Sequence, residues 1–397
     1  MANLLSYEEA LVKVLGAAKP LETESVSLSQ LVGRVVAEPC LARCDLPRFD
    51  NSAVDGYAIH GHDLAAKLLP ISRIVAAGDP AGPPIVPGTC LRILTGAPVP
   101  CGTDAVAMQE EVDVQNGSIH LREPARSGSH IRRRAEEVLA GNLVVGAGRR
   151  ATPGIVAAIA AAGIAHVQAH RIPRVGVLST GSELAAPGQV LSEAQVYESN
   201  TYGLSAWLGN RLHRVIRVQD DPETTKAALG SLFDASCDVV VTSGGVSVGD
   251  RDVVRPALAG LGVETNFWGV AIKPGKPLFF GSAPGGALVF GLPGNPLSAM
   301  ITFRLFVLPL LARLEGESSV SPRQSAQLSE PLVKTAGRLE FVPCCRGEGN
   351  IVRPTTCRGS HMLGGLAEAD ALILFPAHES HLDAGEEVEI MPLWSVR

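Results

Sequence analysis

Several features that would assign this 397-residue chain to a common function class are missing from its sequence. The basic residues form no long run and the formal net charge is -6, which disfavours a nucleic-acid or anionic-membrane partner. The eight cysteines show no paired CxxC knuckles and no Cys/His zinc spacing, so we interpret them as free thiols. The start of the chain lacks a basic region followed by a long apolar run, which predicts no signal peptide and a cytoplasmic location. The most apolar windows, 155–162 and 305–311, are shorter than the ~20 residues that a membrane span needs.

Aromatic residues are scarce as well, at 4% of the chain, although apolar residues make up 46%. Alanine, valine, leucine and glycine therefore supply the apolar fraction, as in compact α/β interiors. The length exceeds the ~250 to 300 residues at which single hydrophobic cores stop growing, so we expect two to four domains.

The first part of the chain predicts a helix, a β-rich insert and a second helix. Ser6 and Glu9 form a capping-box pattern ahead of an amphipathic helix. From Pro47 to about Gly128, short alternating strands lie between Gly/Pro turns. Thr152 then predicts the N-cap of an alanine-rich helix that ends near Gly163, and we expect this helix to pack against the first one.

After Pro173 the pattern alternates strictly between strand and helix up to a helix that begins near Pro296 and that Pro309 should kink or end. This alternation predicts a doubly wound, mostly parallel sheet, because parallel strands need crossover connections. From about Ser321 onward, short strands predict a separate β domain. The predicted domains are 1–46 with 136–171, an insert at 47–135, a central α/β domain at 172–318, and a C-terminal β domain at 319–397.

Ligands of open parallel sheets bind at the carboxyl ends of the strands, and here those ends are rich in glycine and acid. They are STGSEL (179–184), Asp220 with Asp221, TSGGVSVGDRD (242–252) and GLPGNP (291–296). Gly244, Gly245 and Gly249 would let backbone N–H groups approach a phosphate closely, although the segment matches neither the P-loop nor GxGxxG. We therefore predict a phosphorylated ligand at this edge.

Four carboxylates should converge at the same edge: Glu183, Asp220, Asp250 and Asp252. Unpaired carboxylates repel one another, so the pattern predicts a divalent cation, and Mg²⁺ fits best because it binds one or two carboxylates plus substrate phosphates. The alternative for Asp221 or Asp250 is simple N-capping. IKPGKP (272–277) places Lys273 and Lys276 beside prolines that restrict the backbone, and we expect both lysines to face anions.

Three further segments lie outside the central domain. FDNSAVDGYA (49–58) concentrates polar residues in a turn-prone stretch, and LRILTGAPVP (91–100) places Thr95 directly after a strand. Either segment is also compatible with plain turn chemistry. The arginine triplet 132–134 forms either a solvated face or a site that neutralises an anionic ligand.

Taken together, these segments resemble the molybdopterin molybdenumtransferase family, the molybdate insertases of molybdenum cofactor synthesis, related to the C-terminal domain of gephyrin. The resemblance covers nearly the whole chain and depends on DNSAVDGYA, LTGA, STGSEL, TSGGVSVGD, IKPGKP, GLPGNP and GSHM (359–362), in family order. It implies Mg²⁺-dependent hydrolysis of adenylylated molybdopterin, release of AMP, and transfer of molybdenum from molybdate to the dithiolene. It further implies a β-barrel-like C-terminal domain, and a homodimer in which the active site joins the two subunits. The adenylyltransferase of the preceding step is a possible partner.

The resemblance also assigns roles to residues. It implies catalytic roles for Asp55, Thr95, Glu183, Asp220 and Asp252, of which the last three would also hold the metal. With the patterns above, it places the following at the ligand: Ser179, Thr180, Gly181, Ser243, Gly244, Gly245, Gly249, Asp250, Lys273, Lys276, Pro293, Gly294, Asn295, Pro296, Arg132, Arg338 and Ser360.

The chain departs from the family pattern at two places. Gly269 stands after Phe267 and Trp268 where the family commonly has Lys or Arg, and Ala135-Glu136-Glu137 replaces Gly-Glu-Asp. Gly269 keeps open a gephyrin-like scaffold that binds a peptide with reduced catalysis. The molybdopterin adenylyltransferase is another alternative, although it would need neither the N-terminal acidic segment nor the C-terminal domain.

Overall fold

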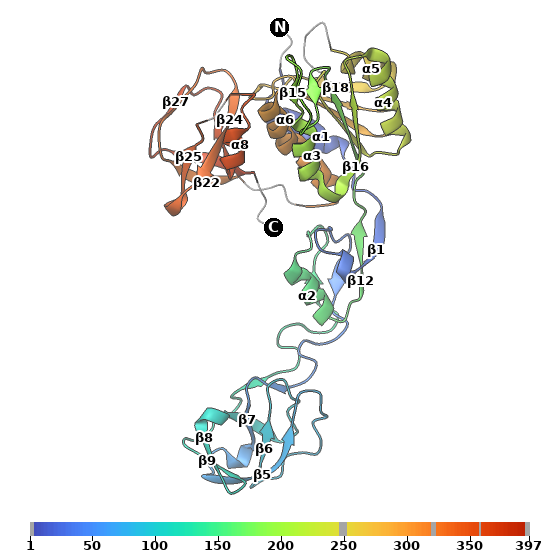
Figure 1. The fold of residues 1–397 in the computed structure, drawn as a ribbon. Coiled ribbons are helices and arrows are strands. Elements are labelled where there is room, and N and C mark those ends of the chain that lie inside the picture. Colours follow the sequence, from blue (N-terminus) through green and yellow to red (C-terminus); the bar gives the residue numbers. More distant parts are fainter. Residues whose placement is uncertain (1–3, 246–251, 319–322, 357–358, 394–397) are drawn as a thin grey trace. The chain divides into compact units, whose positions relative to one another are not determined.

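The computed structural model describes residues 4–245, 252–318, 323–356 and 359–393 (Figure 1). The chain divides into two compact units, one of residues 25–168 and one of residues 1–24 with 169–397. The four predicted domains are a finer division than this and stay a prediction.

The smaller unit is built on a six-stranded sheet in the order β7-β4-β6-β5-β9-β8, which confirms the predicted β-rich insert. Its strands are β4 (Gly56–His60), β5 (Leu68–Val75), β6 (Cys90–Ile93), β7 (Thr103–Met108), β8 (Val112–Gln115) and β9 (Ser118–Leu121). Gly56 in DGYA has a packing reason, because a Cβ there would lie 2.1 Å from the carbonyl oxygen of Ala107 on β7. Any side chain at this position would push β4 and β7 apart.

The rest of the smaller unit contains helix α2 and short strand pairs. α2 (Pro153–Ala161) begins at the predicted cap, where Thr152 Oγ1 accepts a hydrogen bond from the N–H of Ile155, and it ends before Gly163 at φ +80°. The short strands are β2 (Cys40–Leu41) with β11 (Leu143–Val145), and β3 (Asn51–Ser52) with β10 (Ile131–Arg132). β1 (Thr23–Ser27) pairs with β12 (His166–His170).

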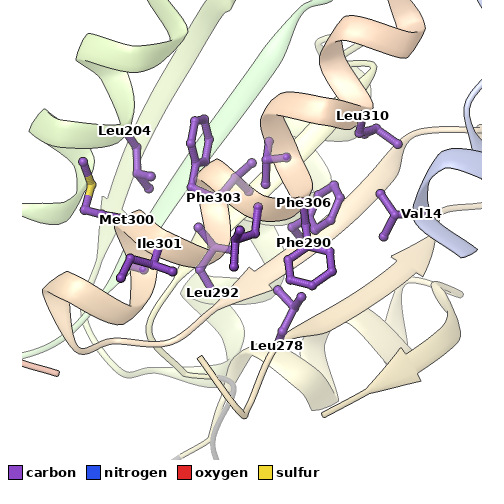
Figure 2. Close-up of a cluster of buried hydrophobic side chains, with 14 of the residues drawn as sticks. Val14, Leu204, Leu278, Phe290, Leu292, Met300, Ile301, Phe303, Phe306 and Leu310 are labelled. Atoms are coloured by element: carbon purple, nitrogen blue, oxygen red, sulfur yellow. The ribbon is translucent and has the colours of Figure 1, made fainter. Parts of the chain in front are cut away.

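Helix α1 (Tyr7–Ala17) has the predicted capping box, with Ser6 and Glu9 hydrogen-bonded in both directions. Its buried face belongs to the core of the larger unit, where Val14 lies beside Phe306 and Leu310 (Figure 2). The Tyr7 ring meets Phe306 edge-on at 5.5 Å. The predicted packing of α1 against α2 is therefore wrong. α2 contacts β11 instead, and the buried face of α1 packs in the core of the larger unit.

The larger unit contains the predicted mostly parallel sheet, in the order β16-β13-β17-β21-β20-β18. β13 (Val175–Thr180) pairs in parallel with β16 (Leu212–Val218) and β17 (Val239–Ser243), and β17 pairs in parallel with β21 (Leu288–Leu292). The predicted alternation of strand and helix ends at the β18 edge of the sheet. There β20 (Phe279–Ser282) runs antiparallel to β18 (Glu264–Trp268) and to β21. A short hairpin connection replaces a crossover helix there.

Helices cover both faces of this sheet, as predicted. α3 (Asn200–Leu208), α6 (Pro296–Thr302) and α7 (Leu308–Leu314) pack with α1 on one face, against residues such as Val177 and Val241. α4 (Pro222–Asp234) and α5 (Val254–Gly260) pack on the other, against Leu178 and Val240. Alternate residues of each strand thus enter different cores, so both strand faces must be apolar.

The helix after Pro296 does not end at Pro309. A π-helical turn (Phe303–Val307) joins α6 to α7, and the helix runs on to Leu314. The wider turn precedes a proline that lacks the N–H needed for the regular i→i−4 ladder. Within the described ranges, Pro296–Leu314 is the stretch long and apolar enough to suit a membrane span, but 78% of it is buried inside the protein, as in a core helix.

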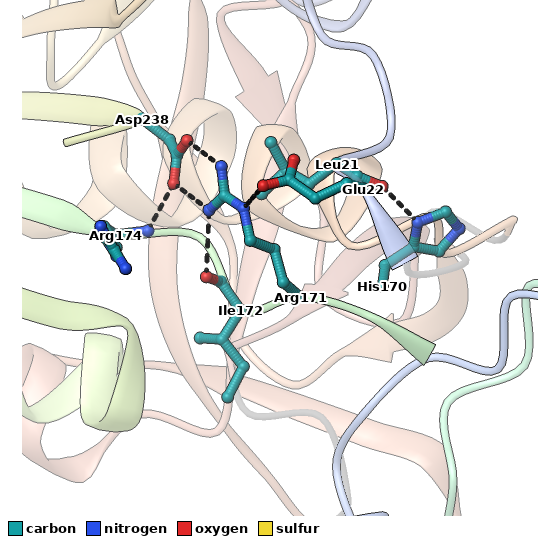
Figure 3. Close-up of polar contacts among 7 residues, drawn as sticks. All are labelled: Leu21, Glu22, His170, Arg171, Ile172, Arg174 and Asp238. Carbon is teal, nitrogen blue, oxygen red and sulfur yellow. Dashed lines mark hydrogen bonds and ion pairs between the residues drawn. The ribbon is translucent and has the colours of Figure 1, made fainter. Parts of the chain in front are cut away.

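Asp238 anchors the entry to the central sheet at the amino end of β17 (Figure 3). Its two carboxylate oxygens each accept a hydrogen bond of 2.6 Å from the Arg171 guanidinium, and Oδ2 also accepts one from the Arg174 N–H. Glu22 pairs with the same guanidinium at 2.5 Å. The chain is thereby fixed where it enters β13.

The C-terminal region closes into a five-stranded barrel, because β24 pairs with both β25 and β26, and β22 and β28 complete the ring. Its strands are β22 (Gln324–Leu328), β24 (Leu339–Arg346), β25 (Ile351–Pro354), β26 (Ala371–Phe375) and β28 (Glu387–Pro392). Helix α8 (Gly364–Glu368) lies between β25 and β26 in sequence. The remaining strands, β23 (Leu332–Val333) and β27 (His381–Leu382), pair with each other. The barrel confirms the predicted C-terminal fold.

Candidate functional site

The carboxyl ends of β13, β17 and β21 lie side by side, because Ser179 pairs with Ser243 and Ser243 pairs with Leu292. The loops that follow also touch, since a Cβ at Gly294 would lie 3.6 Å from the Gly244 Cα. We call this region, formed by residues 179–183, 218–221, 243–245 and 292–295, the strand-end site. Of the predicted residues, Gly249 and Asp250 lie outside the described residues.

Gly244 and Gly245 fit against Thr180 so closely that no side chain has room. A Cβ at Gly244 would lie 2.9 Å from the Thr180 carbonyl oxygen, and one at Gly245 would lie 2.6 Å from the Val254 Cγ2. Both glycines also have positive φ, at +91° and +65°. The Thr180 Oγ1 beneath them is buried and has no partner among the described residues, so it can still bond to a ligand or water.

Asn200, which the sequence reasoning missed, joins two loops of this site. Its Nδ2 donates at 2.8 Å to Ser243 Oγ and at 2.8 Å to the carbonyl oxygen of Gly294. The sequence signal was its position as the first residue of a helix that follows a strand end.

The predicted metal carboxylates have different surroundings. Asp220 Oδ2 accepts a hydrogen bond from the Ser182 N–H at 3.1 Å, while Glu183 is exposed. Asp252 Oδ1 accepts from the Arg255 N–H at 3.3 Å, and its buried Oδ2 has no partner within the described ranges. Partial burial raises the pKa of Asp252. The described residues contain no group of three or more His, Cys, Asp or Glu side chains placed to share a metal, so the three-carboxylate metal site stays a prediction.

Asp221 forms the N-cap that the sequence offered as an alternative for it. Its side chain accepts a hydrogen bond from the Thr224 N–H at 2.8 Å and caps α4. This hydrogen bond lowers the pKa of Asp221.

A group of basic side chains lies where β19 (Ile272–Lys273) pairs with β24 of the barrel. Lys273 Nζ forms an ion pair with Glu340 Oε1 at 3.1 Å, and Arg338 donates to the Ile272 carbonyl oxygen at 3.2 Å. Lys334 was not predicted; it donates to the Arg338 carbonyl oxygen at 2.6 Å, and its burial lowers its pKa. Lys276 is exposed.

Ser360 of GSHM contacts the loop after β21. Its hydroxyl accepts a hydrogen bond from Asn295 Nδ2 at 3.2 Å, and its carbonyl accepts one from the Leu297 N–H at 3.1 Å. Pro293 is buried beside them, and Pro296 is the first residue of α6. The structure thus brings GLPGNP and GSHM together.

The smaller unit holds a second group of predicted residues. Asp55 Oδ1 accepts two hydrogen bonds of 2.7 Å from Thr95, one from its N–H and one from its hydroxyl. These bonds lower the pKa of Asp55. DNSAVDGYA and LTGA are joined further by hydrogen bonds between Ser52 and the backbone of Gly96 and Ala97.

The arginine triplet lies next to this group, because Arg132 pairs with Asn51 in the β3–β10 ladder. Arg133 forms a 2.7 Å ion pair with Asp50, and the Arg134 guanidinium pairs with Asp45. The Arg132 side chain is exposed and has no hydrogen bond or ion pair to any described residue. Its guanidinium could therefore bind an anion without losing a carboxylate partner among the described residues.

Both departures from the family pattern fall at positive φ. Gly269 has φ +91°, and a Cβ there would lie 2.7 Å from Leu4 Cδ2. Ala135 has φ +61°, a conformation that favours the glycine it replaces. Glu136 closes the same turn by accepting the Arg133 N–H at 2.7 Å.

Comparisons with known proteins find matches over most of the chain. Residues 5–163 match the MoeA N-terminal region (domain I and II), 176–313 match a probable molybdopterin binding domain, and 325–393 match the MoeA C-terminal region (domain IV). A molybdopterin molybdenumtransferase of Haemophilus influenzae is 37% identical, with 98% of each chain covered. This chain belongs to the molybdopterin molybdenumtransferase family.

Other family members support the same assignment. Molybdopterin molybdenumtransferase 2 of Mycobacterium tuberculosis is 33% identical, with 99% of this chain and 100% of the relative covered. The crystal structure of the molybdopterin biosynthesis moeA protein from Pyrococcus horikoshii OT3 is 31% identical and superposes with a TM-score of 0.82, covering 98% of this chain and 100% of that one. The strand-end site falls in the part of the chain that matches the probable molybdopterin binding domain, and the Asp55–Thr95 group falls in the part that matches the MoeA N-terminal region.

Proposed function

We propose that this enzyme inserts molybdate into adenylylated molybdopterin, with Mg²⁺-dependent hydrolysis of the adenylate and release of AMP. The observation that supports this most directly is the strand-end site, in which close-fitting glycines and a buried, unpartnered Thr180 hydroxyl can receive a phosphorylated ligand. The basic side chains at Lys273 and Arg338 provide positive charge for an oxyanion such as molybdate.

Asp252 fits a Mg²⁺ ligand best among the predicted carboxylates, because its Oδ2 is buried without a partner among the described residues. Mg²⁺ needs only one or two carboxylates when substrate phosphates complete its coordination. The bound ion would neutralise charge that develops on the phosphoryl oxygens. The chain itself holds the ligand on Gly244 and Gly245 and keeps Asp55 ionised through Thr95.

The test is molybdate-stimulated AMP release. The protein is incubated with adenylylated molybdopterin and Mg²⁺, with and without molybdate, and AMP is quantified by chromatography. Sulfate at the same concentration is the matched oxyanion control. AMP release that molybdate does not stimulate would count decisively against the proposal.

We further propose a homodimer whose active site combines the strand-end site of one subunit with the Asp55–Thr95 group of the other. The two groups belong to different compact units of the chain, and the family resemblance implies that the site joins two subunits. Mixing inactive Asp55→Ala with inactive Asp252→Ala should restore about a quarter of the parent's total activity, since random exchange gives half heterodimers and each holds one intact site. Failure to restore any activity after verified subunit exchange would contradict the shared site.

The scaffold alternative depends on Gly269, where the family commonly has a cation. Its positive φ and the contact with Leu4 provide a local reason for glycine. Gly269→Ala and Gly269→Lys suffer the same backbone strain, but only the second restores the charge. We expect the two variants to have equal turnover, and this result would remove the reason for proposing a scaffold. Higher turnover in Gly269→Lys than in Gly269→Ala would support the scaffold alternative.

A further inference from the structure

Asn200 is buried at the start of α3, between two loops of the strand-end site that lie far apart in sequence. Its Nδ2 has two protons, and both are used, one for Ser243 Oγ and one for the carbonyl oxygen of Gly294, each at 2.8 Å. One side chain thus holds the loop after β17 to the loop after β21.

This contact determines what the Ser243 hydroxyl can do. Ser243 Oγ accepts from Asn200, which directs its own proton away from the amide. No described residue accepts that proton. Since Ser243 immediately precedes Gly244 at the carboxyl end of β17, the O–H remains available as a donor to a ligand at the strand-end site.

The first turn of α3 is fixed independently of any ligand. Glu198 is buried, and its Oε1 accepts the Thr201 N–H at 2.8 Å, while its Oε2 accepts the Thr201 hydroxyl. Arg217 on β16 lies 3.7 Å from the same carboxylate. Because Asn200 lies within this turn, its amide is held in place before a ligand arrives.

We propose that Asn200 is a positioning residue that orients the Ser243 hydroxyl as a hydrogen-bond donor to the phosphate of the bound pterin and keeps the two loops together. This inference rests on the proposed function, because it takes a phosphorylated pterin as the ligand. It assigns Asn200 no direct contact with the reacting atoms.

The test is a double-mutant cycle in the full-length protein, with molybdopterin affinity measured by fluorescence titration. Asn200→Ala and Ser243→Ala should each weaken binding about tenfold, and the double variant should bind about as weakly as either single one. Asn210→Ala, an exposed asparagine just after the same helix, is the matched control and should bind like the parent. Additive losses in the double variant, near a hundredfold, would overturn the proposal.

Asn200→Asp provides a second test that keeps the side-chain shape. A carboxylate at this position would itself accept the Ser243 proton, so binding should fall at least as far as in Asn200→Ala. Parent-like affinity in a folded Asn200→Asp protein would contradict the proposed orientation. If the parent protein itself failed to bind molybdopterin, the proposed function would fail, whereas an intact parent with unaffected variants would refute only the role of Asn200.

The phosphate is tested with dephosphorylated molybdopterin as the probe. With this probe the difference in affinity between the parent and Asn200→Ala should fall well below tenfold, because the acceptor of the Ser243 proton is missing and only the contact between the two loops is lost. A tenfold difference that persists with this probe would overturn the assignment to the phosphate.

Discussion

Carboxylates at the two ends of the central sheet differ in how completely they are hydrogen-bonded. At the amino end of β17, Asp238 has both oxygens bonded to Arg171 and a further bond from the Arg174 N–H. At the carboxyl end, Asp252 keeps a buried oxygen without a partner among the described residues. The first arrangement stabilises the fold, whereas the second leaves bonding capacity for a cation or ligand.

The largest effect should come from removing the unsatisfied carboxylate. Asp252→Ala should keep the fold and lower kcat for AMP release by about a hundredfold or more, since it removes a strand-end ligand of Mg²⁺ and little packing. Steady-state kinetics and a thermal melt would measure both properties. Turnover equal to that of the parent would show that the metal assignment is wrong.

Replacement of Asp238, whose oxygens are both hydrogen-bonded, should lower stability. Asp238→Asn weakens the bonds to Arg171 and should lower the free energy of unfolding of the larger unit by about 2 to 3 kcal/mol, because the pair is mostly shielded from water. Urea unfolding is the measurement. Glu22→Gln, whose side chain is 69% exposed, is the control and should cost about 0.5 kcal/mol or less. An equal loss for both variants would remove the distinction between the two ion pairs.

A related contrast, between Asp50 of the smaller unit and Asp252, concerns the pH dependence of stability. Although partial burial opposes it, bonds from Arg134 and Arg133 lower the pKa of Asp50, so its stabilising contribution is present above the ordinary aspartate pKa of about 4 and is lost as pH falls below it. Burial raises the pKa of Asp252, so the pH dependence of its contribution to stability has the opposite sign. That contribution is present at low pH and is lost as pH rises through the pKa of Asp252 in the folded protein. The loss of stability between neutral pH and pH values near the aspartate pKa should therefore shrink in Asp50→Asn and grow in Asp252→Asn. The measurement is a series of thermal melts across this pH range. If stability depended on pH in the same way in both variants, the distinction between the two aspartates would be wrong.

The smallest effect concerns a departure from the family sequence. Ala135→Gly should raise the free energy of unfolding by about 0.5 to 1 kcal/mol, because Ala135 occupies a left-handed conformation at φ +61°. The matched control, Ala157→Gly in the exposed interior of α2, should lower it by about the same amount. Changes of the same sign at both positions would show that the backbone conformation does not control the effect.

Local sequence patterns predicted elements whose stabilising contacts are themselves local. The capping box at Ser6 and Glu9, the Asp221 cap of α4 and the Thr152 cap of α2 all involve residues three positions apart, so a short stretch of sequence contains both partners. The apolar strand runs of the central sheet were likewise recognisable, because a strand buried on both faces must be apolar throughout.

Contacts between distant segments could not be predicted in this way. The sequence did not reveal the β18–β20 hairpin, which breaks strict alternation, or the packing of α1 against the helix at Phe306. Lys334 and Asn200 were missed for the same reason, since their importance depends on neighbours that are remote along the chain.

By itself the sequence determined the family, the class of each major element and the segments that contribute to the site, because these depend on residue type and local spacing. The tertiary structure decided which polar atoms were already bonded, since hydrogen bonds have short range and their partners come from separate loops. It therefore distinguished Asp238, which the fold satisfies, from Asp252, whose remaining oxygen is available for chemistry.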